Sequence, residues 1–144
     1  MPVVTNYSIL RTDLIELKGL DLPIGVKIAD FELPAEAITR PAVLTSMVYS
    51  GRDGSVLSGS QFFFTLLLND HVLFRDVVFF PKRPVLLHGV AQTPSTSITV
   101  VIPVTSPPIL IGGSNTLSMR SEHFTESDAG VGFSDVVLWW KRDI

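Results

Sequence analysis

The sequence predicts an all-β protein whose body is an antiparallel, jelly-roll-like β-sandwich. Three observations lead to this fold class. Short apolar runs rich in Val, Ile, Phe and Thr recur along the chain, and Gly, Pro, Ser, Asn and Asp separate them. No long window keeps a 3.6-residue apolar period without a proline, and strand and helix patterns do not alternate. Short strands at close spacing are typical of sandwiches and jelly rolls.

The first 50 residues are expected to form an N-terminal arm or a small β subdomain, because prolines interrupt this segment often. Short strands are expected at 14–18 and 26–33, and a helical turn at 33–38 with Pro34 in its first position. Extra strands of the same sandwich are the alternative for this segment. The turn-forming run at 50–55 (SGRDGS) sets the boundary, so 51–144 is predicted to be the jelly-roll body.

Six or seven strands are expected in the body, and a two-residue turn is expected between the first two. The segment 61–68 is almost continuously apolar, which predicts burial on both faces. Asn69 and Asp70 tolerate left-handed backbone and predict a tight hairpin. The predicted strands are 61–68, 71–80, 85–90, 98–102, 116–121 and 134–141.

Composition points to a protein partner. The chain has 144 residues, enough for one domain, and only 17% of them are charged, against about 25% in typical soluble domains. Hydrophobic residues make up 46%, so part of the surface is expected to meet another chain. A well-filled monomeric core is the alternative.

Charge and hydropathy patterns argue against other partners. The net charge is −3 and no basic run exceeds two residues, so a nucleic-acid surface is not expected. The apolar runs are too short to span a membrane, and the N-terminus does not resemble a signal peptide. Synthesis in a cell's cytoplasm is therefore expected. Scarce Asn, Gln, Met and Cys, together with ten prolines, suggest a thermostable protein from a heat-adapted source.

No residue pattern predicts chemistry, so the chain is expected not to be an enzyme. His71, His88 and His123 lack metal-ligand spacing. No serine lies in a G-x-S-x-G motif, and the glycines at 112–113 lack the lysine of a phosphate loop. Cysteine is absent, which excludes thiol catalysis. We therefore assign no catalytic, cofactor-binding or metal-binding residue.

Paired aromatic residues stand out in two of the predicted strands, 71–80 and 134–141. Side chains alternate along a strand, so Phe79 and Phe80 must point to opposite faces, and so must Trp139 and Trp140. One residue of each pair is expected in the core. The other is available for a protein interface or, for a tryptophan, a sugar.

Three fragments resemble lectin-like jelly rolls, including carbohydrate-binding modules. They are LLLNDHV at 66–72, GSNTLSM at 113–119 and FSDVVLW at 133–139. In the order given, they correspond to a hairpin, to a turn followed by a strand, and to a closing strand of that fold. This resemblance implies a carbohydrate-binding module or receptor-binding domain as the alternative function.

The whole chain also resembles the small all-β head-decoration proteins of tailed bacteriophages, in its size, its proline-broken N-terminal segment and its cysteine-free apolar body. That resemblance implies a homotrimer on the capsid exterior of a virion, where it cements the major capsid protein. On this basis Val3, Val4, Tyr7, Ile9 and Leu10 are the expected capsid contacts. The expected oligomer contacts are Phe79, Phe80, Trp139 and Trp140.

Overall fold

A computed structural model of the chain describes residues 2–18, 25–52, 61–79, 85–87, 90–92, 95–124 and 129–143. It contains eleven strands and one short 3-10 helix in these segments. They are β1 (Val3–Arg11), β2 (Ile15–Lys18), β3 (Val26–Leu33), η2 (Ala35–Ile38), β4 (Ala42–Arg52), β5 (Gln61–Leu68), β6 (His71–Phe79), β7 (Val85–Leu87), β8 (Val90–Gln92), β9 (Ser95–Ile102), β10 (Gly113–Phe124) and β11 (Ala129–Asp143). The all-β prediction is confirmed.

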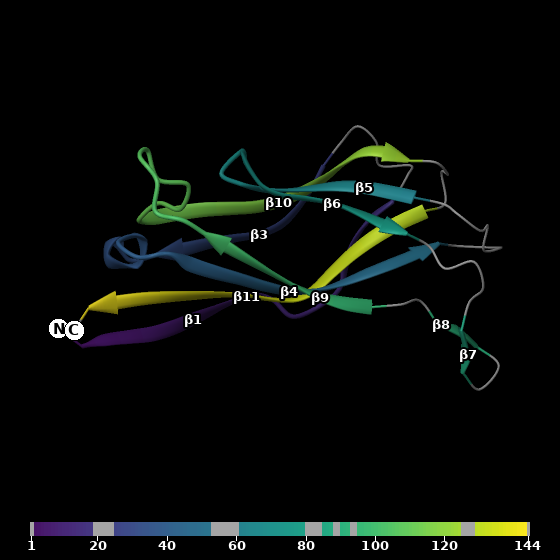
Figure 1. Ribbon diagram of the computed structural model, residues 1–144, viewed down its shortest axis with the longest axis horizontal. Coiled ribbons are helices and arrows are strands. Elements are labelled where there is room, and N and C mark those ends of the chain that lie inside the picture. The colour runs from purple at the N-terminus through teal and green to yellow at the C-terminus, as the bar shows by residue number, and fades with distance from the viewer. Residues whose placement is uncertain are drawn as a thin grey trace.

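The strands form two layers (Figure 1). Sheet A has the order β1-β11-β4-β9, and β2 pairs with β11 on the edge where β1 also lies. Sheet B has the order β3-β10-β5-β6, and β7 and β8 form a separate ribbon. The two chain ends lie side by side, because β1 pairs antiparallel with the end of β11.

The pairing pattern is that of a jelly roll. β1 pairs with β11, β3 with β10, β4 with β9 and β5 with β6, all antiparallel, as in one long hairpin. Two further ladders, β4 with β11 and β5 with β10, fold that hairpin into two sheets. Eight strands connected in this way define the double-sheet jelly roll.

Residues 1–50, expected as an arm or small subdomain, supply strands to both sheets. β1, β2 and β4 belong to sheet A with β11, while β3 pairs with β10 in sheet B. β4 also continues through part of the expected boundary and ends at Arg52. The residues before and after position 51 therefore build the same two sheets, as in the alternative of extra strands in one sandwich.

Strand alternation builds the core between the sheets. In β4, Ala42, Leu44, Ser46 and Val48 are buried, and the residues between them are half-buried. In β11, Val136, Leu138 and Trp140 point inward. From sheet B, buried side chains at alternate positions of β3, β5 and β10 meet them: Ile28, Leu66, Leu68, Leu117 and Met119.

Local turn chemistry explains several element boundaries. Asn69 and Asp70 have φ values of 50° and 64°, the left-handed backbone expected for the β5–β6 hairpin. β3 and β5 have the predicted bounds. η2 starts one residue after Pro34, which is its N-cap and not its first helical residue. The single strand expected at 85–90 is instead the short pair β7 and β8.

Candidate interaction surface

The outward side of sheet A carries exposed apolar side chains. In β1 the residues at odd positions point outward, and Val3, Tyr7 and Ile9 are 42%, 62% and 59% exposed. Trp139 in β11 and Val101 in β9 are also large, apolar and exposed, at 40% and 61%. Exposed apolar side chains are ordinary when single, but a contiguous group of them is characteristic of interaction sites.

Strand register brings these residues into rows across the sheet. Tyr7 lies opposite Trp139, Trp139 opposite Val43, and Val43 opposite Val101. Directly opposite residues share one face of the sheet and contact each other. This row therefore crosses β1, β11, β4 and β9, which are four of the five strands of sheet A.

A second row lies beside the first and is partly polar. Ile9 is opposite Val137, and Val137 is opposite Thr45. We refer to the surface formed by both rows as the open face, with six apolar members. These are Tyr7, Ile9, Val43, Val101, Val137 and Trp139.

The aromatic pair at the β1–β11 end of the open face is held by defined contacts. The rings of Tyr7 and Trp139 lie with centroids 5.6 Å apart and planes tilted by 43°. The indole Nε1 of Trp139 donates a hydrogen bond of 3.0 Å to the hydroxyl of Thr45. Because its polar atom already has a partner, Trp139 presents an apolar surface to solvent.

Charged residues lie at the end of sheet A where the chain ends meet. Lys141 is opposite Thr5, and Asp143 is opposite Val3. Arg40 binds the carboxylate of Asp143 at 2.8 Å. An apolar centre with charged groups at its margin is the usual composition of a protein–protein contact surface.

The structure divides the residues expected as capsid contacts between two faces. Val3, Tyr7 and Ile9 lie on the outer face, whereas Val4 and Leu10 alternate with them and are half-buried. Leu10 packs against the core. Five residues of one strand cannot all face one partner, because successive side chains point in opposite directions.

The residues expected as oligomer contacts are likewise divided. Trp139 belongs to the open face, beside Tyr7. Trp140 is only 8% exposed, lies in the core and donates from Nε1 to the Ser8 hydroxyl at 3.2 Å. The opposite orientation expected for the two tryptophans is therefore found. The side chain of Phe79 and all of Phe80 lie outside the described residues.

Three members of the open face were not singled out in the sequence. Val43, Val101 and Val137 come from three different strands, and only the pairing register places them together. Strand alternation in 98–102 was a usable signal for Val101, because Val100 and Ile102 face inward.

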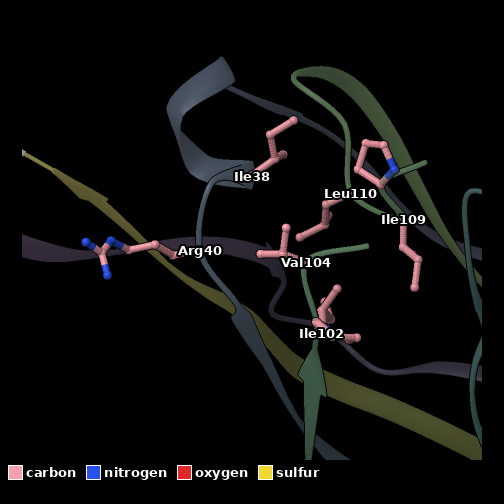
Figure 2. Close-up of a pocket in the computed structure, with 8 residues that line it drawn as sticks. Ile38, Arg40, Ile102, Val104, Ile109 and Leu110 are labelled. Carbon is pink, nitrogen blue, oxygen red and sulfur yellow. The ribbon is translucent and has the colours of Figure 1, made fainter. Parts of the chain in front are cut away.

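The described part of the chain also contains a small depression, which offers no site for chemistry. It lies between η2, the end of β9 and the loop before β10, and it is lined mainly by apolar residues, among them Ile38, Val104 and Leu110. Figure 2 shows the Arg40 side chain extending away from these residues. The volume is about 10 Å³, enough for roughly one water molecule.

Other described groups do not form a reactive cluster. No group of three or more His, Asp or Glu residues in the described segments could hold a metal ion. His71 is exposed at the β5–β6 turn. The pKa of the Asp30 carboxyl lies below its usual value, because Lys27 and then Thr116 donate hydrogen bonds to it at 2.6 and 2.7 Å. Among the described residues, no helix is long and apolar enough to cross a membrane.

The fold and the open face together define a jelly-roll β-sandwich with an apolar sheet surface. Comparison with protein-family models found no match, and comparison with curated protein sequences found none either. The solved structures, in contrast, include chains of similar fold.

One such structure is dimeric latent PorU from Porphyromonas gingivalis, with a TM-score of 0.62 and 10% identity. The match covers 99% of this chain and 13% of the PorU chain, so this chain spans about an eighth of that protein. At this identity the likeness concerns the fold.

Two others are less similar. The CBM36-1 domain of a multidomain xylanase from the hindgut metagenome of Trinervitermes trinervoides has a TM-score of 0.43 and 8% identity, with 96% of each chain covered. A structure of infectious bursal disease virus, Gt strain, has a TM-score of 0.43 and 14% identity, with 98% of this chain and 33% of that chain covered.

Proposed function

We propose that this chain is a non-catalytic structural protein that binds other protein subunits through the open face. In its specific form, the proposal is that the chain binds an assembled virus capsid as an oligomer and stabilises it. The observation that carries the proposal is the row from Tyr7 through Trp139 and Val43 to Val101, which presents apolar side chains across four strands of sheet A.

The chemistry of the open face favours a protein partner. Tyr and Trp are the residues most often found at the energetic centres of protein interfaces. Tyr7 and Trp139 together leave substantial ring surface in water. Complete burial of a large apolar side chain contributes about 1.5–3 kcal/mol, so covering this pair and its valine neighbours gives a useful binding free energy.

Stabilisation of a capsid then follows from mass action. A protein that binds the assembled shell but not the loose subunits shifts the assembly equilibrium toward the shell. Several linked copies increase the effect through their high effective concentration at the surface. No bond needs to be made or broken for this function.

The test is co-sedimentation with assembled shells and, separately, with unassembled capsid protein. We expect the wild-type chain to sediment with shells, and Val101→Lys to weaken that binding about tenfold or more, equivalent to roughly 1.4 kcal/mol. Val72→Lys is the matched control, because Val72 is also an exposed valine on an edge strand but belongs to sheet B. Equal binding by both variants would contradict the proposal.

Carbohydrate binding is the second candidate function, and the exposed ring pair of Tyr7 and Trp139 favours it. Exposed aromatic rings provide stacking surfaces with an apolar body. Val101 lies two strands from Trp139, roughly 10 Å away, so Val101→Lys should leave a sugar site on the rings intact. A glycan array with wild-type protein, Trp139→Ala and Val101→Lys separates the two functions. Carbohydrate binding predicts that wild-type protein and Val101→Lys bind the same glycans and that Trp139→Ala does not.

A further inference from the structure

The edge strands of the two sheets differ in how they are protected against pairing with another chain. β3 carries Lys27, Asp30 and Glu32, and β6 carries Arg75 and Asp76. Charged side chains on an edge oppose the addition of a further strand. By contrast, residues 3–10 of β1 and all of β9 carry no charged side chain. Both uncharged edges therefore belong to sheet A, which also carries the open face.

Of these two edges, β1 is the better template for a further strand. Its outward side chains include the exposed apolar residues Val3, Tyr7 and Ile9. In the described part of β9, only Val101 is apolar among the outward side chains. The pairing of β1 with β11 is also regular from Val3 to Ile9, and it shifts only after Ile9.

We infer that β1 is a self-association edge, to which β1 of a second copy adds antiparallel across a two-fold axis. The inference rests on the proposed function as an assembly protein and names one partner, a second copy of this chain. The regular segment from Val3 to Ile9 has Asn6 at its midpoint, so its longest self-pairing places Asn6 opposite Asn6 of the second copy. A two-fold contact of this kind is isologous and self-complementary.

This register matches the outward residues of β1 with one another. Val3 lies opposite Ile9 of the second copy, and Thr5 lies opposite Tyr7 of the second copy. The most exposed apolar residues of the strand thus gain cross-strand neighbours, which stabilise paired strands by about 0.2–1 kcal/mol each. Backbone hydrogen bonds of the new ladder add to this.

The pairing has a consequence for the open face. Residues opposite each other in a sheet point to the same side, so the open faces of the two copies lie on one side of a single continuous sheet. A partner that covers both receives two linked contacts. An isologous pair gives an even number of copies, in place of the trimer implied by the resemblance to decoration proteins.

Opposite charges at Val3 and Ile9 test the register. These positions lie roughly 20 Å apart within a chain, but they are neighbours between copies. Wild-type protein should have twice the mass of the 15.8 kDa chain in light scattering at micromolar concentration. Val3→Lys/Ile9→Lys should reduce the mass to one chain, and Val3→Glu/Ile9→Lys should restore two. Asp143, opposite Val3 within the chain, favours the lysine at position 3, so restoration by glutamate cannot come from the monomer.

A cysteine crosslink tests the position of the axis. The chain has no cysteine, so Asn6→Cys introduces a single thiol. Directly opposite residues have Cα atoms about 4.5–5.5 Å apart, within the range of a disulfide. Val4→Cys is the matched control on the same side of the strand, because the two copies of Val4 would be roughly 13 Å apart. With an added oxidant, Asn6→Cys should form a covalent dimer at least tenfold faster than Val4→Cys.

Several outcomes would overturn the inference. They are a wild-type mass of one or three chains, equal masses for the two charge variants, and equal crosslinking of the two cysteine variants. Thermal unfolding of each variant separates loss of pairing from loss of fold. The two cysteine variants leave all six members of the open face unchanged, so binding of capsids or sugars by these variants reports on the proposed function independently.

Discussion

Replacement of Asn115 by alanine should be among the most destabilising single changes in the described part of the chain. The Asn115 side chain is 1% exposed and makes four hydrogen bonds at the start of β10. Its Oδ1 accepts from Asn69 Nδ2 at 2.8 Å and from the backbone N–H of Ile111 at 2.9 Å. Its Nδ2 donates to the carbonyl oxygens of Ile111 and Gly113 at 2.9 and 3.1 Å.

The expected loss follows from these four bonds. Each contributes about 1 kcal/mol net, and a partly buried donor or acceptor left without a partner costs about 1–3 kcal/mol, so Asn115→Ala should lower the free energy of unfolding by about 4 kcal/mol. Ser114→Ala is the control, because the exposed hydroxyl of Ser114 donates only to Glu32. Its effect should stay within about 0.5 kcal/mol.

Urea unfolding measures both variants, and hydrogen exchange adds a local readout. The amide of Ile111 should lose protection in Asn115→Ala, because its acceptor is removed. A loss smaller than about 1 kcal/mol, or one equal to that of Ser114→Ala, would refute the reasoning that Asn115 holds the loop before β10.

Three further predictions concern single positions. Asp70→Gly should raise the free energy of unfolding, measured with urea, by about 0.5 kcal/mol. Glycine has no steric cost at φ 64°, but it loses more conformational entropy on folding, which offsets part of the gain. Gly112→Ala should lower it by about 1–3 kcal/mol in the same assay, because a Cβ would lie 2.9 Å from the backbone Cα of Ala35. The pKa of Asp30 is depressed chiefly by Lys27, so its stabilising contribution is present above the ordinary aspartate pKa and is lost as the pH falls through the depressed value; Lys27→Met should flatten that acid limb of a stability–pH profile.

Much of the fold could be predicted because its turn chemistry is local. The Asn69–Asp70 turn follows from the left-handed backbone that these residues accept. β3, β5 and much of β9 and β11 follow from runs of apolar and β-branched residues. These signals lie within a few residues of each other, so no knowledge of the tertiary structure is needed to read them.

β4 was missed because its core side is not uniformly apolar. Buried Ser46 interrupts the inward row, and its hydroxyl is satisfied by the backbone carbonyl of Ser134 at 3.1 Å. That partner lies 88 residues away in the sequence. In a sequence, a polar residue such as serine is expected on the surface unless its buried hydrogen-bond acceptor is known. The inward row of this strand therefore did not show a clear two-residue apolar period.

The open face was predictable only in part, for the same reason. The opposite orientation of Trp139 and Trp140 follows from alternation alone. That Tyr7 lies beside Trp139 depends on the register between the first and last strands, which a single sequence does not contain. The two aromatic residues were therefore assigned to separate contacts, although they form one surface.

The distribution of exposed apolar residues favours a contact function over a general excess of apolar residues. A composition with few charged residues would by itself leave apolar groups scattered over both sheets. In sheet B, Thr65 and Leu67 alternate with the core residues Leu66 and Leu68 of β5, yet they too are buried, so the outer side of this strand is covered at these two positions. Among the described side chains of sheet B, Val72 is the one large apolar residue that is exposed. In sheet A, exposed apolar residues and the half-buried Val43 form a row across four strands, and the row reaches the uncharged part of the edge strand β1. A contact function explains why both features occur in the same sheet, whereas an excess of apolar residues alone does not.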